Sequence, residues 1–380
     1  MIPRRQAALP VLALVVVGIA SSWSYWKGPS QWKPDSLFYE AQVLEVRGKP
    51  AEAARREVFA GPLAAPRRAR EAGLPENERK VSNPEWVRYS AQFYRRRWVV
   101  PVLAAAVFPL FGTRSVLVVS LVGYLACGPL LYALLRRRYP RVESALLAAA
   151  FLLLLPLRFW SSLPLTDSLG LALLIAALTS ALLVLERGLR WLPLWGLTVA
   201  ALAFTRDAAV LAVAAVVWVA LRERSRRTLL LATAGIAAAL PAPLAFGAPL
   251  KRALAYTVNN FFVPPSTSWH FIGEKYGAAA RSLIHNDFNY VLDHPISGLV
   301  LVVGVALLFL PRQHGGSYFS LLRAATLASL VYLFVLPNYT AFRLELVFVP
   351  MAAAGLAALV ATGRRVDRST QTDAGRNPAS

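Results

Sequence analysis

The sequence predicts an all-α, polytopic membrane protein. Of its 380 residues, 57% are hydrophobic and only 16% are charged, and the mean hydropathy is +0.49. Soluble domains rarely have this balance. Apolar stretches long enough to cross a bilayer, at about 20 residues each, recur along the whole chain. The formal net charge of +21 lies largely in short loops between these stretches. Because the positive-inside rule accounts for such loops, no nucleic-acid partner is expected.

The apolar runs predict about ten transmembrane helices. They lie near residues 7–25, 115–135, 143–160, 168–185, 191–204, 208–221, 228–246, 297–311, 321–337 and 344–362. This number places the basic loops on one side of the membrane, which is then the cytoplasmic side. We therefore predict a multi-pass protein of the plasma (inner) membrane with both termini in the cytoplasm.

The predicted organisation follows the chain from one apolar run to the next. Residues 1–25 form the first transmembrane helix, because Trp23 and Trp26 after it fit an interfacial aromatic belt better than a cleavage site. The further segments are a first external loop with interfacial helices (26–114), transmembrane helices 2–7 (115–246), a second external loop (247–296), transmembrane helices 8–10 (297–362) and a disordered cytoplasmic tail (363–380).

Two places limit the number of spans. Residues 99–112 are apolar but short and contain Pro101 and Pro109, so we expect an interfacial or re-entrant helix there. The stretch Thr205-Arg206-Asp207 interrupts a longer apolar run. Two short helices should flank it, and its turn should face a cavity rather than lipid.

Cysteine and histidine usage excludes several kinds of site. Cys127 is the single cysteine, and none of the four histidines forms a His-x-x-x-His pair. A disulfide framework and a cysteine-cluster metal site are therefore excluded. No cofactor is predicted, and a divalent metal stays an open alternative.

Polar residues predicted at the outer face pair carboxylates with cations and aromatic rings. Such a surface beside the membrane could bind an anionic lipid headgroup together with a polar acceptor. The candidate residues are Asp35, Glu40, Tyr94, Arg95, Arg96, Arg97, Asp167, Arg206, Asp207, His270, Tyr339 and Arg343.

Four of these stretches, in this order, resemble the GT-C superfamily of membrane glycosyltransferases, which use polyprenyl-phosphate sugars. The stretches are Pro34 to Tyr39 with Asp35, Tyr94 to Pro101 before a short apolar helix ending in Phe111-Gly112, Pro164 to Ser168, and Thr205-Arg206-Asp207. The resemblance covers roughly residues 1–225. The chain departs from many members in having a single acid at Asp35 and no doubled proline before the short helix.

The resemblance implies an inverting glycosyltransferase whose donor is a polyprenyl-phosphate-linked sugar. Asp35 would be the general base on an acceptor that the sequence does not identify. Arg343, Arg206 and the run Arg95 to Arg97 would hold the phosphate leaving group. The alternative function is a transporter or flippase for a lipid-linked or polar solute, and a third reading is a non-catalytic scaffold. Membrane lipids are expected partners in each case.

Structural explanations compete with these roles. Asp35 and Asp167 could each be the N-cap of the helix that follows it. Arg206 and Asp207 could pair with each other or with neighbours.

For the other cations of the candidate set, too, a structural role is the alternative to a role in the site. Arg95 to Arg97 could be a solvated or snorkelling run. Arg343 could pair with Glu345, and His270 could be structural.

Overall fold

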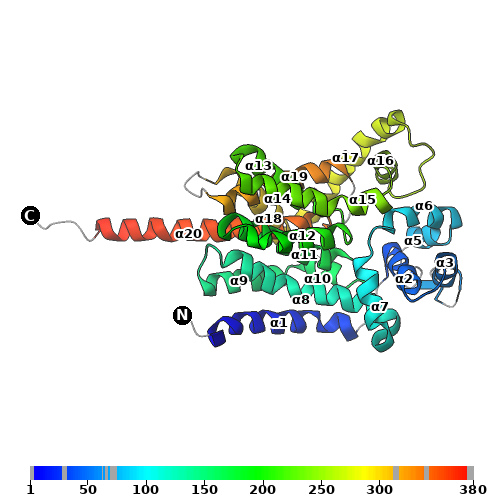
Figure 1. Ribbon diagram of the computed structural model, residues 1–380, viewed down its shortest axis with the longest axis horizontal. Coiled ribbons are helices and arrows are strands. Elements are labelled where there is room, and N and C mark those ends of the chain that lie inside the picture. Colours follow the sequence, from blue (N-terminus) through cyan, green and yellow to red (C-terminus); the bar gives the residue numbers. More distant parts are fainter. Residues whose placement is uncertain are drawn as a thin grey trace, which may run out of the picture.

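The computed structural model describes residues 4–27, 32–61, 63–64, 67–68, 75–310, 316–337 and 342–374. Within these ranges the chain is helical and contains no β-strand, which confirms the all-α prediction. Long helices lie side by side along the longest dimension of the molecule, and short helices cover one end of them (Figure 1). We call these two parts the bundle and the cap.

Five helical segments are long and apolar enough to cross a membrane, so the chain has the character of an α-helical membrane protein. These segments are Ala8–Tyr25, Val99–Leu135, Asp167–Arg187, Arg226–Phe246 and Ser317–Val335. They contain α1 (Arg4–Lys27), α7 (Val99–Phe111) with α8 (Ser115–Leu135), α11 (Asp167–Arg187), α14 (Arg226–Ala239) with α15 (Pro241–Phe246), and α19 (Ser317–Val335).

The predicted number of ten spans is wrong by this criterion. The expected span 143–160 is two helices, α9 (Arg141–Leu152) and α10 (Leu155–Ser161), bent by 60°. Pro156 explains the break, because a proline has no N–H to donate to the carbonyl four residues before it, at Leu152, and its ring would clash with that carbonyl. The other expected spans are short helices: α12 (Leu192–Ala203), α13 (Ala209–Glu223), α18 (Pro295–Ala306) and the apolar start of α20 (Val349–Ala374).

The segments predicted as a second external loop and as a disordered tail contain helices. The second external loop contains α16 (Leu250–Val258) and the 25-residue α17 (Trp269–Asp293). α20 continues to Ala374, beyond the predicted start of the tail at residue 363. Once a helix is nucleated by packed apolar residues, each further residue adds one hydrogen bond. Polar segments adjoining such helices can therefore extend them.

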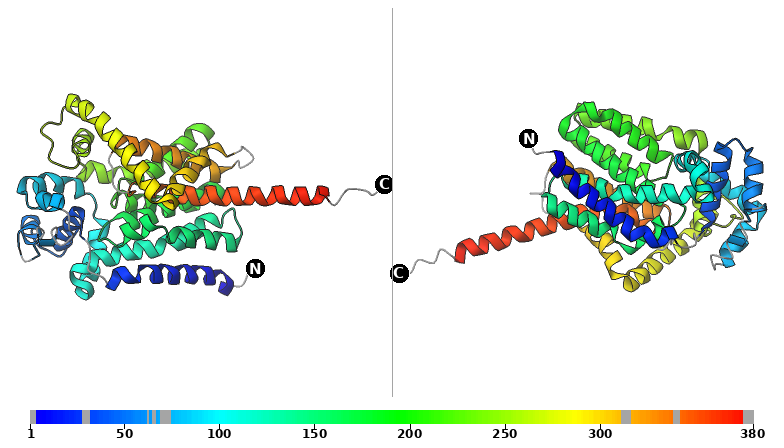
Figure 2. Two further views of the ribbon diagram at one scale, coloured as in Figure 1. Left: turned by 180° about the vertical axis from the view of Figure 1, so that it is seen from behind. Right: turned by 90° about the horizontal axis from the view of Figure 1, so that it is seen from below.

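The bundle is centred on α11, which packs against α8, α12 and α19. α1 lies at the edge of the bundle against α8 and α9 (Figure 2). α8 and α11 approach closely because Gly123 has no side chain; a Cβ atom there would lie 2.5 Å from the backbone nitrogen of Leu169. Ser168 Oγ donates a hydrogen bond of 2.6 Å to the Ser120 carbonyl across the same contact. This contact fixes the first turn of α11.

We expect Gly123→Ala to destabilise the protein by about 1–3 kcal/mol, because the added methyl group overlaps backbone atoms that cannot rotate away. Gly196→Ala in α12 is the matched control, because nothing lies within 4 Å of its missing Cβ atom. Alanine is the better helix former, so this control should be neutral or slightly stabilising. Thermal unfolding of the two purified variants measures the difference. Equal unfolding midpoints would contradict this account of the α8–α11 contact.

The cap consists of α2 (Pro34–Val46), α3 (Ala51–Phe59), α5 (Pro75–Val81), α6 (Pro84–Tyr94), α7 and α16. Every residue of α2 from Ser36 to Leu44 is buried. Phe38 is at its centre and stacks on Tyr94 with ring centroids 4.4 Å apart. The short apolar helix predicted at 99–112 is confirmed as an element, α7, and ends at Gly112, whose φ of +55° favours glycine.

The two predicted external loops join in the cap. Trp86 Nε1 donates to the Phe261 carbonyl at 2.8 Å, and Lys80 Nζ donates to the Asn260 carbonyl at 3.2 Å. α1 begins, and α20 ends, at the end of the bundle opposite the cap (Figures 1 and 2). The cap therefore closes one end of the bundle, and polar residues gather at the boundary between the two.

Candidate functional site

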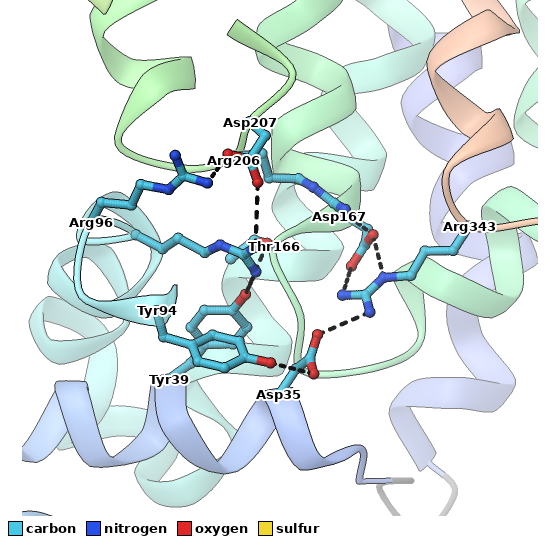
Figure 3. Close-up of polar contacts among 10 residues, drawn as sticks. Asp35, Tyr39, Tyr94, Arg96, Thr166, Asp167, Arg206, Asp207 and Arg343 are labelled. Carbon is cyan, nitrogen blue, oxygen red and sulfur yellow. Dashed lines mark hydrogen bonds and ion pairs between the residues drawn. The ribbon is translucent and has the colours of Figure 1, made fainter. Parts of the chain in front are cut away.

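Asp35 is the link between the cap and the bundle. Lys33 is the N-cap of α2 and Pro34 its first residue, so Asp35 lies inside the first turn. Its carboxylate accepts a hydrogen bond of 2.6 Å from Tyr94 Oη and one of 2.9 Å from Arg343 Nη1. The alternative that Asp35 caps the helix is therefore wrong. Its side chain reaches away from the α2 backbone toward two distant elements (Figure 3).

Asp167 holds the other side of the same arginine. Arg343 Nε and Nη2 donate to the two carboxylate oxygens of Asp167 at 2.7 and 2.9 Å, which is a bidentate pair. Arg206 also pairs with Asp167, whose side chain is 1% exposed. Thr166, not Asp167, is the N-cap residue of α11. The capping alternative is wrong here too, and Arg343 bridges Asp35 and Asp167.

Asp207 begins a second chain of contacts. It pairs with Arg96 and lies 3.7 Å from Arg97. Arg97 Nη1 donates to Tyr39 Oη at 2.7 Å. Tyr39 lies 3.3 Å from the hydroxyl of Thr166, beside Asp167. The two chains therefore meet at the start of α11 (Figure 3).

Neighbours in sequence do not pair in this site. Arg206 pairs with Asp167 and Asp207 pairs with Arg96, so these two adjacent residues have different partners. Arg343 does not pair with Glu345, whose buried carboxyl group lies next to that of Asp287 instead.

Most of the predicted site residues are brought together, and some are not. One cluster is formed by Asp35, Tyr94, Arg96, Arg97, Asp167, Arg206, Asp207 and Arg343. Glu40 is buried and pairs with Arg68 of the cap. Arg95 is exposed, so the alternative of a solvated run holds for Arg95 but not for Arg96 and Arg97, which lie beside Asp207. His270 has a side chain 84% exposed and lies 3.2 Å from Glu274. Tyr339 lies outside the described residues.

The members of this cluster other than Asp167 line a cavity of about 420 Å³ between the bundle and the cap. Cavities of this size suit small-molecule ligands. Its described walls carry six basic side chains, namely Lys33, Lys80, Arg96, Arg97, Arg206 and Arg343, and two acidic ones, Asp35 and Asp207. Aromatic rings including Trp86, Phe93, Trp160 and Tyr256 complete the walls. The cavity is therefore suited to a ligand that combines an anionic group with an apolar or ring-shaped part.

Several contributors were not predicted, among them Lys33, Trp160 and Gly170. Lys33 lines the cavity two residues before Asp35. Trp160 lies beneath Arg343, whose guanidinium carbon is 5.1 Å from the ring centroid. Gly170 leaves room for Arg206, because a Cβ atom there would lie 2.6 Å from Arg206 Cδ. Lys33 could have been found from its position beside the candidate base, whereas the other two depend on helix packing.

The cations around Asp35 change its acidity. Burial alone would raise the pKa of Asp35, but Arg343, the Tyr94 hydrogen bond and Arg97 outweigh burial and hold the pKa below its usual value. Asp35 is therefore an ionised carboxylate at neutral pH. Burial and the positive charge of Arg343 lower the pKa of Lys33, with Asp35 acting in the opposite direction.

The carboxylates of this site are engaged by arginine and tyrosine side chains. Among the residues that the structure describes, no group of three or more His, Cys, Asp or Glu could hold a metal ion. No known protein family and no curated protein matches the sequence. A functional conclusion therefore depends on the geometry and charge of the cavity.

Proposed function

We propose that this protein is an inverting glycosyltransferase that moves a sugar from a polyprenyl-phosphate donor to a hydroxyl acceptor. The observation that carries the proposal is the cavity in which an ionised carboxylate, Asp35, lies against a group of arginines. A carboxylate that is ionised at neutral pH can accept the proton of an acceptor hydroxyl. Arginines can hold the phosphate that leaves.

The chemistry can be written with these residues alone. The acceptor oxygen attacks the anomeric carbon while its proton passes to Asp35. The bond between that carbon and the phosphate oxygen breaks, and its electron pair leaves with the lipid phosphate. Arg343 stabilises the negative charge that develops on the phosphate, together with Arg206, which pairs with the same carboxylate, Asp167. A single displacement inverts the anomeric centre.

Arg343 connects binding to catalysis in this scheme. In the structure it is shared between Asp35 and Asp167. A phosphate that bound Arg343 would compete with Asp35 for its Nη1 group. Weakening that contact would raise the basicity of Asp35, because Arg343 is the strongest of the groups that lower its pKa. Donor binding would thereby prepare the base.

The proposal is tested by incubating purified protein with a panel of radiolabelled polyprenyl-phosphate sugars and membrane extract as a source of acceptor. We expect transfer of label and release of lipid phosphate with one donor, and neither reaction with Asp35→Asn. A transporter or flippase would instead move the intact donor across vesicle membranes. Such movement without cleavage of the sugar–phosphate bond would overturn the proposal.

Removing the Tyr94 hydroxyl should change the pH dependence. That hydroxyl donates to Asp35 and stabilises its charged form, so Tyr94→Phe should raise the pKa of Asp35. The acid limb of the pH–rate profile should then move to higher pH, because the carboxylate becomes protonated sooner as the pH falls. Tyr89→Phe, a tyrosine of α6 outside the cavity lining, is the control. An unshifted acid limb in Tyr94→Phe would mean that Asp35 does not titrate in the reaction.

The cavity end should face outward in this function, and both chain ends should face the cytoplasm. Ser266 lies between α16 and α17 at the cap end, and Ser225 precedes α14. Cys127 is buried, so it should react little with a membrane-impermeant maleimide. In intact cells we expect labelling of Ser266→Cys and not of Ser225→Cys, with Ser225→Cys labelled only after permeabilisation. Labelling of both from one side would reject this orientation.

A further inference from the structure

The charges of the cavity do not balance. Lys80, one of the six basic side chains of the walls, has its own partner in Glu76 at 2.8 Å. The other five cations, Lys33, Arg96, Arg97, Arg206 and Arg343, lie around three carboxylates, Asp35, Asp167 and Asp207. Four of the cations, the arginines, each lie within 4.0 Å of a carboxylate. Placing charges away from water is costly unless opposite charges accompany them. An excess of two positive charges therefore favours a ligand with two negative charges.

Lys33 is the cation of this cluster without a carboxylate partner. Among the residues that the structure describes, no acidic group lies within ion-pair distance of its ammonium group. It lines the same cavity as Arg343 and is the N-cap residue of α2, a helix of 13 residues. Lys33 and Arg343 therefore line the same cavity as Asp35.

Phosphate diesters and monoesters differ in negative charge, and an excess of positive charge in the cavity can distinguish them by that difference. A phosphate diester carries one negative charge, whereas a monoester carries close to two above its second pKa, which is near 6. In the proposed transfer, the donor is a diester and the released lipid phosphate is a monoester. Interactions that become stronger as negative charge develops on the phosphate accelerate the reaction. Equal binding of the diester and the monoester would not.

We propose that the cavity binds a phosphate monoester dianion in preference to a phosphodiester monoanion, and that Lys33 supplies the cation that distinguishes them. The inference rests on the proposed function in one respect, namely that the phosphate belongs to a lipid. What it adds to the proposed function is the charge state of the phosphate that the cavity prefers. A consequence is that the lipid phosphate product should bind more tightly than the donor and inhibit the reaction.

The test compares two probes that share one alkyl chain, dodecyl phosphate and dodecyl methyl phosphate, by calorimetric titration of the full-length protein in lipid nanodiscs. Equal chains make membrane partitioning cancel in the ratio of dissociation constants. At pH 8 we expect the monoester to bind at least about tenfold more tightly, which is the minimum that one charge-assisted hydrogen bond adds. At pH 5 the monoester carries one charge, so the ratio should fall toward one.

Lys33→Met should reduce the ratio at pH 8 to less than about threefold. Lys49→Met is the matched control, because Lys49 is a lysine of the cap that pairs with Glu57 away from the cavity; this variant should keep the full ratio. Equal affinity for the two probes at pH 8, or an unchanged ratio in Lys33→Met, would overturn the inference. Inorganic phosphate that binds as tightly as dodecyl phosphate would overturn the assignment to a lipid.

These binding experiments require no sugar transfer, so the inference and the proposed function can fail separately. Selection of the monoester without any transfer would leave the charge selectivity intact and reject the enzyme. Transfer with no selection between the probes would support the enzyme and reject the role of Lys33.

Discussion

Asp35→Asn should lower turnover by about 10²–10⁴-fold, which is the usual contribution of general-base catalysis. The amide has the same shape as the carboxylate, and its oxygen can still accept the Tyr94 hydrogen bond of 2.6 Å. It cannot take up a proton from an acceptor hydroxyl. Arg343 loses one carboxylate but keeps its bidentate pair with Asp167, so the fold should survive.

The measurement is the rate of sugar transfer at saturating donor, together with the unfolding temperature of the purified variant. Glu40→Gln is the matched control, because Glu40 is a buried acid of α2 that pairs with Arg68 away from the cavity. This control should retain most of its turnover. A folded Asp35→Asn variant with near-normal turnover would show that Asp35 is a structural bridge between cap and bundle, and the proposed base would have to be abandoned.

Arg343→Ala should weaken binding of a polyprenyl-phosphate donor by about 1.5–3 kcal/mol, the range for a charge-assisted hydrogen bond. It should also destabilise the protein by up to about 3–5 kcal/mol, because Asp35 loses its arginine and Asp167 keeps only Arg206. Arg343→Lys should restore little of either effect. A single ammonium group cannot reproduce the planar fork that reaches both oxygens of Asp167 and one of Asp35.

Donor affinity and unfolding temperature should be measured on the same preparations, so that loss of binding is distinguished from loss of fold. Arg158→Ala is the control; this arginine donates to the Ser21 carbonyl at 3.3 Å and does not line the cavity. It should bind the donor normally. Unchanged donor affinity in a folded Arg343→Ala or Arg343→Lys variant would remove Arg343 from the phosphate site.

The sequence by itself determined the class of protein and most of its helices. Apolar runs of 14–21 residues are local properties, and burial in lipid or in a bundle favours helices in each of them. The polar residues that matter could also be selected in advance, because a charge beside an apolar span is costly and seldom occurs without a role. Asp35, Asp167, Arg206 and Arg343 were all found in this way.

The sequence indicated less clearly how long each helix is and in which direction each charged side chain points. Each apolar run was expected to be one span, whereas α9 and α10 are separated by a bend of 60°, and α12, α13 and α18 are shorter than the helices that qualify as spans. The only pairings that the sequence offered for its charged residues, as alternatives to a role in the site, were with neighbouring residues. Successive side chains on a helix or turn point in different directions, so Arg206 and Asp207 meet different partners.

Only the tertiary structure decided which charges meet. Arg343 reaches Asp35 across 308 residues of sequence and Asp167 across 176. No spacing rule connects positions so far apart, because their contact depends on how α2, α11 and the segment before α20 pack. That Lys33 has no carboxylate partner also follows only from the ion pairs that the other cations of the cluster form in the structure. Composition identifies the groups that must be neutralised, but packing determines which are left for a ligand.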